Sequence, residues 1–175
     1  MVSARTVGCI GALAASGVSL APSAFAEPQL PDLDRYTAVT TSDYTVAIPT
    51  SGYNGAVSSV QFSTPAGQNC SVVINVRGMW DNATCTGPIP GTSHSSVSAS
   101  YLEAGKFSDS AFSAGQGKLL PAGSKVVFTR GVWTGTCAVD QVMTACVVDT
   151  VPRPGELTSG APHGFVLGPD ESSTF

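Results

Sequence analysis

The sequence predicts a mostly β protein: a single small domain built as a disulfide-stapled antiparallel sheet or sandwich, with an extended N-terminal arm. Three observations support this fold class. Charged residues make up only 11% of the 175-residue chain, Gly and Pro are frequent, and no apolar stripe at helical spacing stands out. Short β-branched runs alternate with turn residues along most of the chain. Four of the five cysteines lie within or beside such runs, where disulfides can join neighbouring strands.

The first 26 residues have the three parts of a secretory signal peptide. Arg5 gives a positive start, Val7–Ala21 is apolar and uncharged, and a small-residue site follows. That site has Ala24 and Ala26 directly before Glu27, where cleavage is expected. The apolar run is nearer ~15 residues than the ~20 that span a bilayer, which favours cleavage over an N-terminal membrane anchor. The sequence therefore predicts export to the cell envelope or the exterior, with no transmembrane segment after cleavage.

The rest of the chain is expected to form an arm followed by one domain. Residues 27–55 form a Pro- and Thr-rich extended arm with little apolar periodicity, in which Asp43–Ile48 fits one edge strand. Such an arm wraps the domain or stays mobile. Residues 56–175 form the disulfide-stapled β domain. A chain of about 150 residues buries roughly two-thirds of its unfolded surface, which suits a single core.

The stretch 60–85 contains the clearest strand signals. Val60–Phe62 alternates apolar and polar side chains, and Thr64–Gly67 supplies a turn. Cys70–Val76 is rich in β-branched residues and is expected to be the next strand, with alternate side chains on opposite faces. Asp81-Asn82 marks a bend before Cys85.

The second half of the chain contains further strand signals. The segment 107–112 fits either a strand or a turn, and Leu119–Ser124 is a turn with Pro and Gly in favourable places. Two of the strands are expected to form a hairpin across Asp140-Gln141. Val151–Pro162 is expected to be a loop, and the chain to end in a polar tail. The expected strands are Val97–Tyr101, Lys125–Thr129, Trp133–Val139, Met143–Asp149 and His163–Leu167.

Export leaves an even number of cysteines in an oxidising compartment. Cys9 lies in the leader, before most of the apolar run, where a lipid anchor is not expected. The other four allow three pairings, and we favour Cys70–Cys85 with Cys137–Cys146, because each pair closes a strand–turn–strand segment. Zinc is the alternative. Gaps of fourteen and eight residues fit no CxxC pair, and thiolates tend to be oxidised outside the cell.

The order of these features resembles that of small exported proteins of unknown function from mycobacteria and related actinobacteria. After the leader come an arm, a Phe-x-Thr-Pro-x-Gly-x-x-Cys strand entry, a second cysteine, Leu-Pro-x-Gly before a strand, a cysteine pair and His-Gly-Phe. The resemblance implies export and the local cysteine pairing, and it implies no activity. The matching residues are Pro31–Leu33, Tyr36-Thr37, Phe62–Cys70, Cys85, Leu120–Gly123, Cys137, Cys146 and His163–Phe165.

The charge of the chain argues against two classes of partner. Without Arg5 the chain has seven basic and twelve acidic residues, a net charge of −5. Nucleic acids and anionic lipid surfaces are bound by clustered Lys and Arg, so neither is expected as a partner. The expected partner is a protein, glycan or lipid of the envelope or the exterior.

No catalytic residue, metal site or cofactor is expected from the sequence. His94 and His163 lie in no HExxH, Gly-x-Ser-x-Gly or Cys–His family context. His94 lies in a Ser/Thr/Gly loop, where a solvated ring is expected, and His163 opens a strand, where its ring is expected to cap a turn or bond a backbone group. The segment 115–118 echoes a phosphate loop and is interpreted as a surface turn.

The aromatic residues give the one candidate binding surface. Trp80 and Trp133 are expected to pack in the core near the disulfides. The alternative is an exposed aromatic surface for a sugar or peptide, formed with Tyr36, Tyr44, Tyr53 and Tyr101. The favoured function is a non-enzymatic binding module. One alternative is a secreted proteinase inhibitor that presents the Cys137–Cys146 loop, and the last is a small extracellular hydrolase, which would need a histidine base or two converging carboxylates.

Overall fold

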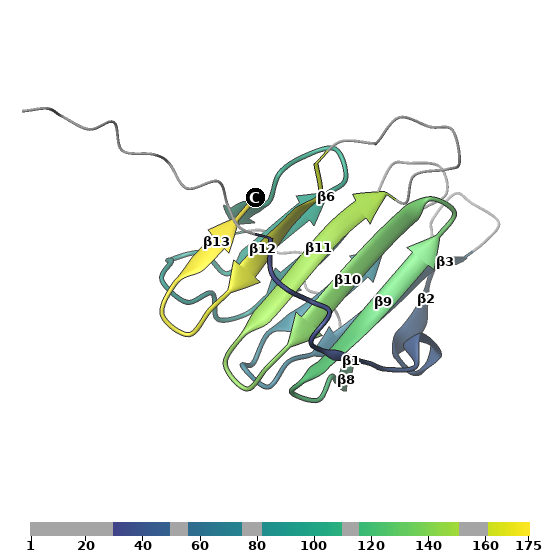
Figure 1. Cartoon of the computed structure of the whole chain (residues 1–175), viewed down its shortest axis with the longest axis horizontal. Helices are drawn as coiled ribbons and strands as arrows, with labels where there is room; N and C mark the ends of the chain where they lie inside the picture. The colour runs from purple at the N-terminus through teal and green to yellow at the C-terminus, as the bar shows by residue number, and fades with distance from the viewer. Residues whose placement is uncertain (1–29, 50–55, 75–81, 110–115, 151–160) are drawn as a thin grey trace, which may run out of the picture.

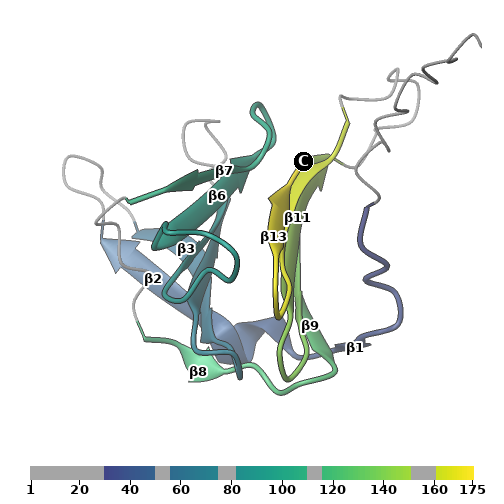
Figure 2. The same cartoon turned by 90° about the vertical axis from the view of Figure 1, so that its left-hand side faces the viewer.

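The computed structural model describes residues 30–49, 56–74, 82–109, 116–150 and 161–175, and these residues fold into two sheets packed face to face (Figures 1 and 2). The predicted fold class, a disulfide-stapled β sandwich, is confirmed. Sheet A has the order β1 (Thr37–Ala38), β9 (Ser124–Arg130), β10 (Trp133–Val139), β11 (Thr144–Thr150), β12 (His163–Leu167) and β13 (Ser172–Thr174). Sheet B has the order β2 (Thr45–Pro49), β3 (Ala56–Ser63), β4 (Asn69–Val73), β5 (Asn82–Thr86), β6 (Ser96–Ser100) and β7 (Lys106–Ser108), with β8 (Lys118–Leu119) beside β3.

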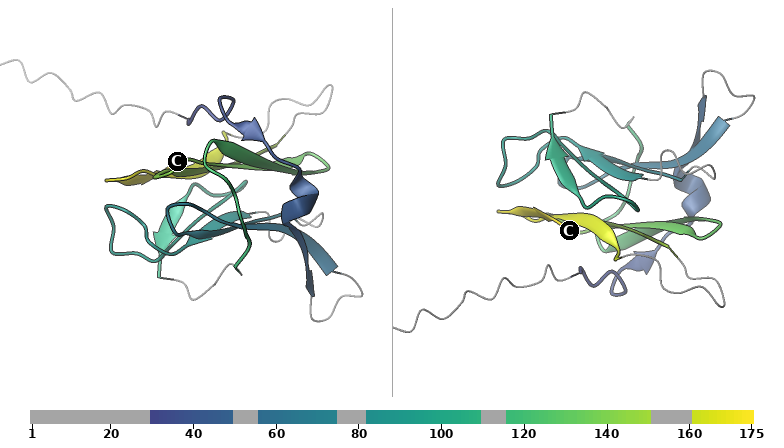
Figure 3. Two further views of the ribbon diagram at one scale, coloured as in Figure 1. Left: turned by 90° about the horizontal axis from the view of Figure 1, so that it is seen from below. Right: turned by 90° about the horizontal axis from the view of Figure 1, so that it is seen from above.

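The N-terminal arm belongs to both sheets. Its strand β1 pairs in parallel with β9 in sheet A, and β2 pairs antiparallel with β3 in sheet B. The short 3₁₀ helix Thr41–Tyr44 lies between them and crosses from one layer to the other (Figure 3). Tyr36 and Tyr44 are both 5% exposed, so each anchors the arm by burying an aromatic ring. The edge strand predicted within the arm is present as β2.

The arm also lies against the outer face of sheet A. The Lys125 ammonium donates hydrogen bonds to the Leu33 carbonyl oxygen at 3.0 Å and to Asp34 Oδ1 at 3.3 Å. A groove of about 500 Å³ runs between residues 30–34 and strands β9 to β11. These contacts hold the arm on the sheet.

Both predicted disulfides are present, and both lie in the core between the sheets. Cys70 pairs with Cys85 across β4 and β5, and Cys137 pairs with Cys146 across β10 and β11. All four residues are fully buried. Each disulfide therefore joins adjacent strands of one sheet, and its sulfur atoms add to the packing between the sheets. The core also contains Val60, Phe62, Val72, Val97, Val126, Val139, Val148, Phe165 and Leu167.

One end of the sandwich is closed by a buried polar network around Gln68. The Gln68 side-chain oxygen accepts hydrogen bonds from the hydroxyls of Thr64 and Thr144, and its amide group donates to the Pro88 carbonyl oxygen at 2.9 Å. Gln68 is 1% exposed. Because Gln68 follows the turn after β3 and Thr144 begins β11, the network ties sheet B to sheet A at this end.

The two sheets approach closely where β10 has a glycine. A Cβ atom on Gly135 would lie 2.4 Å from Cγ1 of Val72, which is shorter than any normal contact. We expect Gly135→Ala to lower the free energy of unfolding by about 1–3 kcal/mol, because the added methyl forces the sheets apart. Urea denaturation measures this change.

The control for this prediction is Thr136→Ala, which removes a half-buried side chain from the outer face of the same strand. Combining Gly135→Ala with Val72→Ala makes room for the new methyl. The double variant should therefore lose less free energy of unfolding than the sum of the two single losses. Full additivity would contradict close packing at Gly135.

Several predicted elements match, and others need correction. Strands are present at all five segments expected in the second half of the chain, within a few residues at each end. The bend predicted at Asp81-Asn82 is wrong at Asn82, because Asn82 is the first residue of strand β5. The predicted polar tail contains a further strand, β13. The last two residues of the predicted strand Cys70–Val76 and most of the predicted loop Val151–Pro162 lie outside the described residues. In the part of the chain that the structure describes, no helix has the length and apolar character needed to span a membrane.

Candidate functional site

The end of the sandwich opposite Gln68 contains a pocket between the two sheets. Strand β10 begins there at Trp133, β11 ends there at Thr150, and β12 begins there at His163. From sheet B, β6 ends at Ser100, and Tyr101 begins the turn into β7. We call this end, opposite the Gln68 network, the open end.

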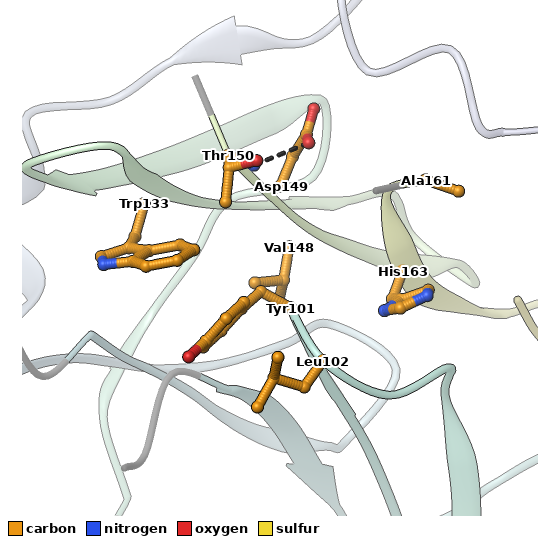
Figure 4. A pocket seen from close by; sticks show the side chains of 8 residues that line it. All are labelled: Tyr101, Leu102, Trp133, Val148, Asp149, Thr150, Ala161 and His163. Atoms are coloured by element: carbon orange, nitrogen blue, oxygen red, sulfur yellow. Dashed lines mark hydrogen bonds between the residues drawn. The ribbon is translucent and has the colours of Figure 1, made fainter. Parts of the chain in front are cut away.

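The pocket has a volume of about 420 Å³, within the range of small-molecule sites. Figure 4 shows Trp133 and Tyr101 on one flank, His163 on the other, and Val148 between them. Both sheets contribute to its walls, so its shape depends on how the sheets pack. The lining residues are Tyr101, Leu102, Trp133, Val148, Asp149, Thr150, Ala161 and His163.

The aromatic flank joins the two sheets. The ring centroids of Tyr101 and Trp133 are 4.1 Å apart and the ring planes are tilted by 39°. Aromatic pairs of this kind are worth about 0.5–1.5 kcal/mol beyond their buried area. Both residues are half-buried and pack on the edge of the core. The pair therefore forms a fixed wall rather than a loose surface patch.

The opposite flank is a histidine whose orientation is set by the backbone. His163 Nδ1 lies 2.9 Å from the carbonyl oxygen of Ser100, which links β12 of sheet A to β6 of sheet B. A carbonyl oxygen only accepts hydrogen bonds, so Nδ1 must carry the proton. In the neutral ring Nε2 is then an acceptor. The expectation that this ring bonds a backbone group is confirmed.

The described lining of the pocket contains few charged groups. Among the described lining residues the one carboxylate is Asp149, whose Oδ1 accepts a hydrogen bond from the Thr150 amide at 2.6 Å. The described lining contains no Lys or Arg. The pocket is thus apolar and aromatic along most of its wall, with hydrogen-bonding groups at His163, Asp149 and Thr150.

The structure separates the aromatic residues named in the sequence analysis. Tyr101 and Trp133 meet at the open end, whereas Tyr36 and Tyr44 are buried where they anchor the arm. Trp133 lies on the rim of the core instead of deep inside it. Trp80 and the cleavage-site residues Ala24, Ala26 and Glu27 lie outside the described residues.

The other histidine lies away from the pocket. His94 Nδ1 is 3.2 Å from Asp109 Oδ1, and the His94 ring stacks on Phe107 with centroids 6.3 Å apart. The side chains of His94 and Asp109 are 42% and 71% exposed. This pair pins the loop before β6 to the end of β7 at the surface. Among the residues that the structure describes, no group of three or more His, Cys, Asp or Glu residues is arranged to hold a metal ion.

Sequence reasoning missed four residues of the pocket: Leu102, Val148, Thr150 and Ala161. Leu102 is 70% exposed. Its one local signal in the sequence was a leucine placed directly after a predicted strand, where an apolar side chain can lie on the surface. Val148 belongs to a predicted strand, but only the packing of β11 against β6 shows that it forms the floor. Comparison of the chain with protein-family models, curated proteins and solved structures finds no match.

Proposed function

We propose that the protein is an exported, non-enzymatic binding module that holds a protein, glycan or lipid of the cell envelope or the exterior at its open end. The observation that supports this most is the aromatic-walled pocket of about 420 Å³, built from both sheets. Two buried disulfides and the packed sheets stiffen its walls. A preformed site loses less entropy when it binds, so even a small pocket supports useful affinity.

The inhibitor alternative has less support. Four residues, Asp140–Met143, join β10 to β11, and the Asp140 amide donates to the Met143 carbonyl oxygen at 2.7 Å. Cys137 and Cys146 face each other inside the sheet, behind this turn. A substrate-like inhibitor offers an extended segment to the protease, whereas in this tight turn Gln141 and Val142 are exposed and Asp140 and Met143 are half-buried.

The hydrolase alternative also has less support. His163 uses Nδ1 to bond a backbone carbonyl oxygen, and His94 is paired with Asp109 on an exposed surface. A general base works best in a site that excludes water and holds a nucleophile within hydrogen-bond distance. An exposed Asp–His pair alone does not meet that requirement.

Retention on isolated cell envelopes tests the proposal. We expect the wild-type protein to be retained and Leu102→Asp to lower retention at least tenfold. The substitution removes an apolar contact with the ligand and places an unpaired charge where the ligand would cover it. Val142→Asp is the matched control, since Val142 is 57% exposed at the other end of the sandwich. Equal retention of both variants, or no retention of the wild type, would contradict a binding site at the open end.

A further inference from the structure

The groove between the arm and sheet A is a second concave surface, separate from the pocket at the open end. It lies on the face of sheet A that is turned away from sheet B, where residues 30–36 run along the sheet (Figure 2). Its volume is about 500 Å³, one wall is the arm, and the floor comes from β9, β10 and β11. Among the described lining residues, the groove and the pocket share only Asp149. What the groove binds is therefore independent of the proposed function.

The floor of the groove is elongated along the strands. Lys125 lies in the same row of sheet A as Ala145, and Asp149 lies four residues further along β11. At about 3.3 Å per residue, the floor is roughly 13 Å long. This length matches an extended peptide of about four residues.

The floor and the wall both offer apolar side chains to such a peptide. Val127 and Val147 lie on either side of Thr136, and all three residues are half-buried. Leu30, on the arm, is 48% exposed. A partner that covers these side chains removes apolar surface from water, which favours binding. Thr134 and Thr136 are two residues apart on one face of β10, the repeat of an extended main chain, so their hydroxyls can bond peptide groups.

The charges around the groove favour a basic partner. Three carboxylates line it, those of Asp32, Asp34 and Asp149, against the one ammonium of Lys125 in the described lining. The Lys125 side chain is only 17% exposed, and its ammonium is held by the Leu33 carbonyl oxygen and by Asp34. Two carboxylates are therefore in excess over the cation.

Asp32 and Asp149 can each accept a further hydrogen bond. Both residues are exposed, and each uses Oδ1 to accept a backbone amide, that of Asp34 or that of Thr150. A carboxylate has a second oxygen and further lone pairs. Residues 27–29 and 151–160, outside the described residues, add two acidic residues and one basic residue in the sequence, so they do not reverse the acidic excess.

We infer that the groove between the arm and sheet A binds an extended, basic segment of a partner protein. Apolar side chains of the segment pack on Val127 and Val147, and its Lys or Arg side chains pair with Asp32 and Asp149. The arm, which Lys125 holds on the sheet, is then one wall of a binding surface.

Four tetrapeptides, each acetylated and amidated at its ends, test this inference by NMR titration of the ¹⁵N-labelled protein. We expect Val-Lys-Val-Lys to shift the amide signals of Val127, Thr136 and Val147. Val-Gln-Val-Gln, without the charges, should bind about fivefold more weakly, and Val-Glu-Val-Glu should cause no shift. Ser-Lys-Ser-Lys, which keeps the charges but not the apolar side chains, should also bind at least about fivefold more weakly.

Salt separates the charged contacts from the apolar ones. Raising NaCl from about 0.01 M to about 0.15 M shortens the Debye length from about 30 Å to about 8 Å. Binding of Val-Lys-Val-Lys should weaken over this range, whereas binding of Val-Gln-Val-Gln should not change.

Three variants locate the effect. Asp32→Asn with Asp149→Asn keeps both Oδ1 atoms but removes both charges, so Val-Lys-Val-Lys should bind this double variant only as tightly as Val-Gln-Val-Gln. Asp170→Asn, at an exposed carboxylate in the turn between β12 and β13, is the matched control and should bind as the wild type does. Thr136→Arg places a bulky cation on the floor and should abolish binding, a result that does not depend on the arm carboxylates.

Other results would overturn the inference. If Val-Gln-Val-Gln binds as tightly as Val-Lys-Val-Lys, the carboxylates do not select a basic partner. If Ser-Lys-Ser-Lys binds as tightly, the groove is an acidic surface that does not recognise an apolar segment. If the basic peptide shifts only Tyr101, Trp133 and His163, it binds at the open end and the groove is not its site. If no peptide shifts the groove signals, the inference fails, while envelope retention that depends on Leu102 still supports the proposed function.

Discussion

Removing the Cys70–Cys85 disulfide by Cys70→Ala with Cys85→Ala is expected to lower the free energy of unfolding by about 3 kcal/mol. The cysteines are 15 positions apart in the chain, and the disulfide restricts that loop in the unfolded state. The sulfurs are also fully buried between the sheets, so their removal leaves a packing defect. The Cys137–Cys146 disulfide closes a loop of only nine positions, so removing it by Cys137→Ala with Cys146→Ala should lower the free energy of unfolding slightly less. Urea denaturation of the oxidised proteins measures both.

A matched control and a reduction experiment complete this prediction. The control is Ser71→Ala, which alters the residue next to Cys70 on the opposite face of β4. Ser71 Oγ is buried without a hydrogen-bond partner in the described structure, so its removal should not lower the free energy of unfolding. Because all four cysteines are fully buried, dithiothreitol should reduce the native protein only as fast as it unfolds. Rapid reduction in the absence of denaturant would contradict the buried placement.

Gln68→Leu is expected to lower the free energy of unfolding by at least about 2 kcal/mol. Leucine has a similar size, but it leaves the hydroxyls of Thr64 and Thr144 and the carbonyl oxygen of Pro88 without the partner they have in the native protein. These groups lie at the closed end of the sandwich, where Gln68 is 1% exposed. The midpoint of thermal or urea unfolding measures the loss.

Two further variants separate the network from the general effect of losing a glutamine. Gln61→Leu, at a half-buried position on the outer face of sheet B, should change stability by less than about 0.5 kcal/mol. Adding Thr144→Val to Gln68→Leu removes one of the orphaned hydroxyls and should recover part of the loss. Equal effects of Gln68→Leu and Gln61→Leu would contradict the network.

Local sequence patterns predicted the strands whose residues have strong preferences. The β10–β11 hairpin has β-branched residues on both arms and a polar turn at Asp140-Gln141, and β12 matches its predicted bounds, His163–Leu167. The cysteine pairing followed from the same hairpin logic. In each case neighbours in the chain are also neighbours in the sheet, so a local pattern was sufficient.

The elements that the sequence did not predict depend on distant partners. Strand β5, Asn-Ala-Thr-Cys-Thr, begins with two residues of low strand preference and lies between β4 and β6, with which it pairs. Strand β13 is polar and pairs with β12. Strands β1 and β8 have two residues each and pair in parallel with distant strands.

The candidate site was predicted only in part for the same reason. Trp133 and Tyr101 were both named as candidate surface residues, yet 32 positions of chain separate them and they belong to different sheets. Their contact, the floor at Val148 and the orientation of His163 arise from how the sheets pack. Residue types alone indicate aromatic surface but cannot place it.

Hydroxyl-radical footprinting with and without isolated cell envelopes tests the central claim, binding at the open end, most directly. Trp133 and Tyr101 are reactive side chains in the pocket, and Met143, at the opposite end and half-buried, is an internal control. We predict that envelopes lower the oxidation of Trp133 and Tyr101 and leave that of Met143 unchanged. Protection of Met143 alone, or unchanged oxidation of all three residues, would contradict the claim.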